Sequence, residues 1–381
     1  MYLVLFVYIL TLVFLYDFFS KKNGFNINYI ICCIVLILVA GFRYRIGFDT
    51  INYMEHFKFI PTISEFINGK EFNGDILWGY IQVISKSIYN DFFIVQIIQA
   101  VIVNVAVFWF IKRHSPKPFL GILLYYLLQW WNFCFEGMRE SIAIAFFLFA
   151  LDAIIAKNSI KRYYLRVWPA FFAHTFGFIT LLFPFIKYIK FNKYTILCTL
   201  AVVCFSFLIS DFVNSVLIYI ETISGVAAEK TMKYLEDDIY GMNTLSFNGI
   251  ISILLGYVLP PLYIVYVLYK NKEGHYNHII PFVLIFAIIA ILRINMTIFY
   301  RFLNYFEIPV IVAFTQSICI VKNKVRSILY FLMFCMVFIR FNMLLTPFIG
   351  NEVKTYHRYV PYNSIFEKKY NKNSELIFNS F

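Results

Sequence analysis

Long apolar runs, separated by short loops that carry most of the charge, are the feature that most constrains this chain. Ten runs are close to the 17–25 residues that a transmembrane helix needs. They lie at residues 2–19, 28–42, 92–111, 119–135, 140–156, 194–220, 247–269, 278–298, 299–321 and 326–348. Because a helix satisfies its own backbone hydrogen bonds in lipid, runs of this kind predict an all-α fold. We expect one polytopic membrane domain over residues 1–381.

Composition supports the same class. Charged residues make up 14% of the chain and hydrophobic residues 61%, whereas soluble domains average about 25% charged residues. The net charge of +12 comes from Lys and Arg spread over many loops, which indicates membrane topology and contact with anionic lipids, with no nucleic-acid partner. No Walker-type or dinucleotide-binding glycine motif occurs, and we expect neither a cofactor nor a metal ion.

Two shorter stretches, 76–90 and 167–186, leave the number of crossings open. The first carries polar residues, and the second contains two prolines, a glycine and a histidine, a pattern tolerated at membrane depth where protein or water satisfies the backbone. One of them must be re-entrant, so we expect roughly ten to twelve transmembrane helices. The positive-inside rule places the lysine-rich connectors in the cytoplasm and the loops 43–75, 133–139 and 221–246 outside.

Two clusters of charge interrupt the apolar pattern on this outer side. Gly41-Phe-Arg-Tyr-Arg-Ile-Gly-Phe-Asp49 ends one run, and Trp130-Trp-Asn-Phe-Cys-Phe-Glu-Gly-Met-Arg139 interrupts another. Arginine at membrane depth is costly, and its planar fork suits phosphate oxygens. Arg43 and Arg45 are either diphosphate ligands or residues that snorkel at a helix end. Arg139 is either a diphosphate ligand or an i,i+3 partner of Glu136.

Four further residues are candidates for chemistry. Arg293 and Arg301 fall inside what would otherwise be one apolar stretch, so they either bind diphosphate or end two helices at the outer boundary. His174 is the histidine within an apolar run, and it is either a packing residue or a general base. Asp49 is a second candidate base, or a carboxylate that orients an arginine.

The order of these clusters resembles the EpsG-like family. Its marks here are Arg43-x-x-x-Gly-x-Asp-x-x-x-Tyr53, then Asn132 with Arg139, then Lys161-Arg-Tyr-Tyr164 and Ala170 before His174, then Arg301-Phe-x-x-Tyr-Phe306, and finally Tyr359-Val-Pro-Tyr362. The resemblance covers nearly the whole chain. Thr175 follows the histidine at a position where the family commonly has serine.

This resemblance implies a Wzy-type glycosyltransferase with a GT-C-like helical architecture in the bacterial cytoplasmic membrane. Such an enzyme joins repeat units carried on undecaprenyl diphosphate at the outer face, during synthesis of exopolysaccharide, capsule or O-antigen. Its partners would be a lipid-linked glycan donor and acceptor, membrane lipids and, as an optional partner, a chain-length regulator. The catalytic candidates are His174, Asp49 and Arg139. The diphosphate-binding candidates are Arg43, Arg45, Arg139, Arg293 and Arg301. The alternative is a flippase or transporter of lipid-linked oligosaccharide, which would also need an arginine-lined cavity.

Overall fold

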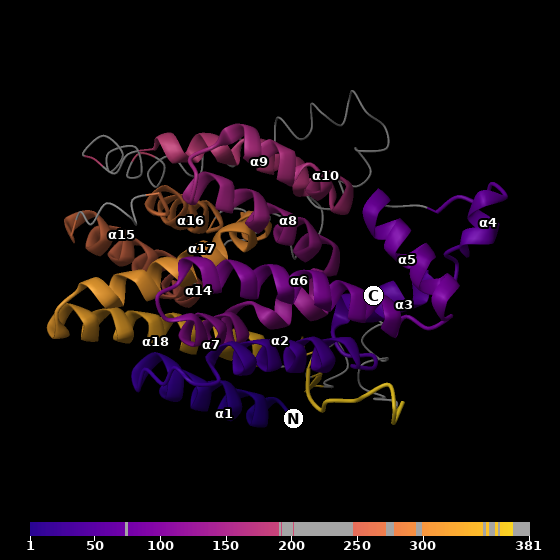
Figure 1. The fold of residues 1–381 in the computed structure, drawn as a ribbon, viewed down its shortest axis with the longest axis horizontal. Coiled ribbons are helices and arrows are strands. Elements are labelled where there is room, and N and C mark those ends of the chain that lie inside the picture. Colours follow the sequence, from indigo (N-terminus) through magenta and orange to yellow (C-terminus); the bar gives the residue numbers. More distant parts are fainter. Residues whose placement is uncertain are drawn as a thin grey trace. The chain divides into compact units, whose positions relative to one another are not determined.

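The computed structural model confirms the expected all-α polytopic membrane fold (Figure 1). It describes residues 1–72, 75–189, 192, 201, 247–271, 278–294, 299–345, 348–349, 355–356 and 359–368. The predicted run 194–220, apart from residue 201, and the predicted outer loop 221–246 lie outside the described residues. Two short strands, β1 (Phe348–Ile349) and β2 (Thr355–Tyr356), pair antiparallel near the C-terminus. The chain divides into two compact units, Met1–Pro184 with Phe341–Phe381 (unit 1) and Phe185–Arg340 (unit 2).

The long helices of unit 1 follow the apolar runs closely. They are α1 (Tyr2–Leu12) with its π-helical continuation η1 (Val13–Phe18), α2 (Phe25–Gly41), α6 (Phe93–His114), α7 (Pro118–Leu128), the π-helical turn η2 (Asn132–Glu136) and α8 (Met138–Ile155). Leu3 and Val4 of α1 are 74% and 68% exposed. Such exposure of large apolar side chains is expected where lipid is the solvent, because lipid does not penalise it.

Basic residues gather where several of these helices end, and we call this the basic end of unit 1. Asp17 at the end of η1 accepts a hydrogen bond from the Leu120 backbone N–H at 2.6 Å, at the start of α7. Near the end of α8, Asp152 accepts from Arg113 Nε at 2.5 Å and from Arg166 Nη1 at 3.1 Å. The connectors 112–117 and 157–166, which are both predicted to be cytoplasmic, therefore meet at one carboxylate. We call the opposite end of α8, about 20 Å away by helical rise, the Arg139 end.

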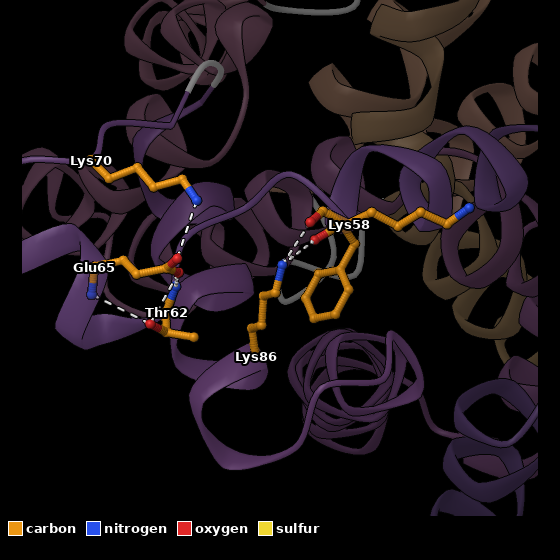
Figure 2. Close-up of polar contacts among 6 residues, drawn as sticks. Lys58, Thr62, Glu65, Lys70 and Lys86 are labelled. Atoms are coloured by element: carbon orange, nitrogen blue, oxygen red, sulfur yellow. Dashed lines mark hydrogen bonds and ion pairs between the residues drawn. The ribbon is translucent and has the colours of Figure 1, made fainter.

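Three short helices, α3 (Phe48–Phe57), α4 (Ile63–Ile67) and α5 (Ile76–Ile88), lie beyond the Arg139 end of the unit 1 bundle (Figure 1). In Figure 2, Lys86 Nζ donates to the Phe57 and Lys58 carbonyl oxygens at 3.1 and 2.8 Å, and so caps the C-terminal end of α3. Thr62 and Glu65 form a capping box at the start of α4. These local contacts explain why a polar segment without a long apolar run is folded.

Helix α5 begins and ends at the same end of unit 1. Asp75, just before α5, pairs with Arg139 at 2.9 Å. Asp91, just after it, pairs with Lys368 at 3.2 Å, in the tail segment whose Ile365 N–H bonds to the Phe42 carbonyl oxygen at the end of α2. The stretch 76–90 therefore has the geometry of a segment that does not cross.

The stretch 167–186 belongs to a helical hairpin of α9 (Ile160–Val167), α10 (Pro169–Ala173) and the 3₁₀ helices η3 (Thr175–Leu181) and η4 (Phe183–Tyr188). It leaves the basic end at Arg166, reaches the Arg139 end at Thr175 and then returns beside α9, where the Tyr163 hydroxyl donates to the Thr180 carbonyl oxygen at 2.6 Å. Gly177 makes the return possible, because a Cβ there would lie 2.2 Å from the Ala170 carbonyl oxygen. This is a re-entrant geometry.

Unit 2 contains α14 (Phe247–Ile253), the π-helical turn η5 (Leu254–Val258), α15 (Leu259–Asn271), α16 (Ile280–Leu292), α17 (Phe299–Ile320) and most of α18 (Asn323–Leu345). The predicted break near 293–301 is confirmed, since α16 ends at Leu292 and α17 begins at Phe299. Within the described part of both units, four helices are long and apolar enough to cross a membrane, namely Phe93–His114, Phe247–Asn271, Phe299–Ile320 and Asn323–Leu344. The number of ten to twelve crossings stays a prediction.

Candidate functional site

The two clusters that the sequence analysis places on one side of the membrane pack directly on each other. The Thr50 hydroxyl donates to the Phe135 carbonyl oxygen at 2.7 Å, and the Asp49 backbone N–H donates to Glu136 Oε2 at 3.0 Å. Gly47 allows this contact, because its φ is +93° and a Cβ there would lie 2.7 Å from the Phe135 carbonyl oxygen. Only glycine adopts this conformation at no steric cost. The Gly-x-Asp motif is therefore a joint between the segments 41–50 and 132–138.

Arg43 lies inside this joint and is fully buried. Its guanidinium donates to the Ala40 carbonyl oxygen, to Thr50 Oγ1 at 3.0 Å and to Met138 Sδ at 3.3 Å. The Phe135 ring lies 4.7 Å from the guanidinium carbon, within the range of a cation–π contact. These contacts direct the donors of Arg43 to the protein interior, so its geometry is that of a residue that joins two segments. That Arg43 binds diphosphate stays a prediction.

The C-terminal Tyr-Val-Pro-Tyr motif completes the joint. The Tyr359 hydroxyl donates to Glu136 Oε1 at 3.0 Å, and its ring lies 5.2 Å from the Trp131 ring. The Tyr362 hydroxyl donates to the Val39 carbonyl oxygen at 3.1 Å. Glu136 therefore accepts hydrogen bonds from two segments more than 200 residues apart in the sequence.

Arg139 presents a different environment from Arg43, although both are arginines of the same end. It lies in the first turn of α8, and its side chain is 36% exposed. Nε donates to the Tyr53 hydroxyl at 3.2 Å, and Nη1 donates to Asp75 Oδ2 at 2.9 Å. The carboxylate that pairs with Arg139 at this distance is thus Asp75, while Glu136 is bound to Asp49 and Tyr359. Sequence reasoning missed Asp75.

The tip of the re-entrant hairpin reaches the same carboxylate. Thr175 Oγ1 donates to Asp75 Oδ1 at 3.0 Å, so Asp75 bridges Arg139 and the residue that follows His174. His174 is 4% exposed, and its Nδ1 accepts a hydrogen bond from the Phe176 backbone N–H at 3.3 Å. A neutral imidazole that accepts at Nδ1 carries its proton on Nε2. In this arrangement Nε2 is a donor, and Nδ1 accepts a proton only after the contact with Phe176 opens.

Arg45 and Asp49 stand at the start of α3. Arg45 has a φ of +52°, in the left-handed region, and its Nη1 lies 3.5 Å from Glu55 Oε1. Its side chain is 13% exposed. Asp49, partly exposed, is the acidic residue of the first turn of α3, where the helix dipole favours the ionised carboxylate. Both residues adjoin the joint in sequence, and the Asp49 backbone N–H contacts it through its hydrogen bond to Glu136.

Arg293 and Arg301 belong to unit 2. The Arg293 guanidinium carbon lies 4.7 Å from the ring centres of both Tyr257 and Tyr300. Its Nη1 is buried and has no hydrogen-bond partner among the residues that the structure describes. Arg301, partly exposed, is in the first turn of α17. The structure adds Arg340, which the sequence analysis did not single out. It is buried and forms a bidentate pair with Glu307, with N–O distances of 2.5 and 3.0 Å.

The sequence was compared with families and with known proteins. It matches the EpsG family over residues 26–364. The chain belongs to the EpsG family. The matched range contains the joint, Arg139, the hairpin that carries His174, and Arg293, Arg301 and Arg340 of unit 2. No curated protein and no solved structure matches the sequence. Membership of this family, together with the apolar helices, indicates a membrane protein of the polysaccharide-polymerase type.

Proposed function

We propose that this protein is a polysaccharide polymerase that joins glycan repeat units carried on undecaprenyl diphosphate. It would act at the outer face of the bacterial cytoplasmic membrane, in the synthesis of exopolysaccharide, capsule or O-antigen. The observation that carries the proposal is the meeting of Arg139, from α8, with the His174–Thr175 tip of the re-entrant hairpin through Asp75. A partly exposed arginine is thereby linked, through Asp75 and Thr175, to the segment that carries a buried histidine, and these two residue types could supply the two functions that the reaction needs.

The reaction breaks the bond between the anomeric carbon of the donor glycan and its diphosphate, and forms a bond to a hydroxyl oxygen of the acceptor. Negative charge develops on the leaving diphosphate, and guanidinium donors stabilise such charge. Arg139 is the first candidate for this role because its fork is partly exposed at the Arg139 end. Arg45 is the second candidate, and its Nη1 lies 3.5 Å from Glu55 Oε1.

The acceptor hydroxyl must lose its proton, and two residues are candidate bases. His174 would accept it at Nδ1 once the Phe176 N–H moves away, or it would instead donate from Nε2 to a substrate oxygen. Asp49 would accept it directly as a carboxylate. The variant His174→Gln distinguishes the two assignments. Glutamine donates and accepts hydrogen bonds but takes up no proton at neutral pH, so the variant should be inactive if His174 is the base and active if Asp49 is the base.

The assignment to the outer face rests on the charge distribution of unit 1. The basic connectors 112–117 and 157–166 meet at Asp152, as expected for the cytoplasmic side. The Arg139 end is the opposite one. A lipid-linked donor and acceptor, membrane lipids and a chain-length regulator are the partners that this function would require. Arg293 and Arg301 remain candidate diphosphate ligands within unit 2.

The decisive experiment uses purified protein in liposomes supplied with one defined undecaprenyl-diphosphate-linked repeat unit. Polymerase activity produces a ladder of longer glycans that are still attached to lipid. A flippase or transporter would move the substrate between leaflets and leave its glycan unchanged. Substrate movement without elongation would refute the proposed function, and the rival function would replace it.

A further inference from the structure

Asp75 uses its two carboxylate oxygens for two different partners. Oδ2 accepts from Arg139 Nη1 at 2.9 Å, and Oδ1 accepts from Thr175 Oγ1 at 3.0 Å. The Asp75 side chain is 11% exposed, whereas that of Arg139 is 36% exposed. A carboxylate bound to a guanidinium nitrogen uses the same donor that a phosphate oxygen would use. Asp75 therefore already occupies part of the binding face of Arg139.

The backbone at the start of α5 offers a second set of hydrogen-bond donors to this carboxylate. Asp75 is the N-cap residue of α5, with φ −67° and ψ 131°, and its side chain makes no capping hydrogen bond. An aspartate in this conformation normally accepts from the backbone N–H groups of the first turn, where the helix dipole also favours negative charge. One rotation of the side chain would exchange the contacts with Arg139 and Thr175 for a cap on α5.

We propose that Asp75 is a displaceable carboxylate that holds Arg139 in the empty site, and that the diphosphate of the lipid-linked substrate replaces it. This inference rests on the function proposed above. A diphosphate carries more negative charge than one carboxylate and offers several oxygens to the guanidinium fork, so it competes effectively for Arg139. The displaced carboxylate then caps α5, at a distance from the incoming like charge.

The exchange also affects the hairpin that carries His174. While Asp75 is bound to Arg139, its other oxygen holds the Thr175 hydroxyl. When Asp75 turns to α5, this hydroxyl loses its partner and becomes available to a substrate oxygen beside His174. Binding of the diphosphate would thus be coupled to release of the hairpin tip, and an empty site would keep the tip in place.

The test measures binding of farnesyl diphosphate and of inorganic pyrophosphate to the full-length protein in detergent, by isothermal titration calorimetry. Asp75→Asn removes the competing charge but keeps an acceptor for Thr175 and an efficient N-cap for α5. Since a pair of this exposure contributes modestly, we expect Asp75→Asn to bind both ligands about three- to tenfold more tightly. Asp91→Asn makes the same charge change at the same end of unit 1, where Asp91 pairs with Lys368, and should bind as the wild type does.

Arg139→Gln separates failure of this inference from failure of the proposed function. If Arg139→Gln loses affinity while Asp75→Asn binds no more tightly than the wild type, Asp75 does not compete, and the inference is overturned. If Arg139→Gln binds as well as the wild type, Arg139 does not hold diphosphate, and its role in the proposed function is overturned too. An equal gain in Asp91→Asn would show a general effect of charge and would also overturn the inference. Thermal unfolding of each variant verifies that it is folded.

Discussion

Replacing Arg139 by lysine tests the proposed diphosphate site most directly. The arginine uses two separate nitrogens, with Nε bound to the Tyr53 hydroxyl at 3.2 Å and Nη1 bound to Asp75 at 2.9 Å. A lysine keeps the positive charge but has a single ammonium, which cannot occupy both positions or grip two phosphate oxygens in a plane. The substitution therefore removes the planar arrangement of donors and keeps the positive charge.

The magnitude follows from the hydrogen bond that is lost. A hydrogen bond to a charged group contributes about 1.5–3 kcal/mol, and about 1.4 kcal/mol corresponds to a factor of ten in rate. We expect Arg139→Lys to lower glycan elongation in liposomes by about ten- to a hundredfold. Insertion into the membrane should be normal, because the residue lies at a helix end and stays charged.

Arg162→Lys is the matched control. Arg162 lies on α9 and is exposed. Its replacement by lysine also exchanges a guanidinium for an ammonium group, but away from the Arg139 end. Its elongation rate should stay within about twofold of the wild type, as is usual for surface substitutions. Elongation by Arg139→Lys at the rate of this control would refute the reasoning, because a bidentate grip would then contribute nothing to the reaction.

Three further changes test other parts of the structure. Gly47→Ala should lower the melting temperature more than Gly69→Ala. Both glycines have φ above +90°, but a Cβ at position 47 would lie 2.7 Å from the Phe135 carbonyl oxygen, whereas one at position 69 meets no described residue within 4 Å; equal losses would contradict a role of Gly47 in the joint. His174→Gln should abolish elongation and retain pyrophosphate binding if His174 is the base, whereas wild-type elongation would leave Asp49 as the candidate. Asp152→Asn should destabilise the protein by about 1–3 kcal/mol, because a buried acceptor of three basic side chains loses its charge, and an unchanged melting temperature would contradict this.

Sequence patterns predicted the helices of unit 1 and placed its two charged clusters on the same side, whereas their direct contact is a finding of the structure. The apolar run 92–111 corresponds to α6 (Phe93–His114), and the run 28–42 corresponds to α2 (Phe25–Gly41). Both predictions depend on local properties, since hydrophobicity determines a helix in lipid and loop charge determines the side. The stretch 76–90 corresponds to α5 (Ile76–Ile88). The helices α3 and α4 have no comparable apolar run, and local capping contacts such as that of Lys86 at the end of α3 stabilise this segment.

Asp75 could not be found in the same way. It lies in a polar loop, and its partners Arg139 and Thr175 are 64 and 100 residues away in the sequence. A carboxylate in such a loop has many possible partners, and tertiary packing selects between them. Arg340 differs, because it stands alone in an apolar run and Glu307 stands in another. Isolated opposite charges within membrane helices usually pair, so this signal was present in the sequence.

The contrast between Arg43 and Arg139 shows why residue type alone does not define a binding site. Both are arginines at one end of unit 1, and both belong to the motifs that carry the family resemblance. Arg43 is enclosed by carbonyl, hydroxyl and aromatic groups of the joint, and withdrawing it would leave buried acceptors without a donor. Arg139 is partly exposed and paired with Asp75, the N-cap residue of α5, whose side chain makes no capping hydrogen bond. Arginines of two neighbouring motifs therefore differ in burial, and only the partly exposed one, Arg139, is proposed here as a diphosphate ligand.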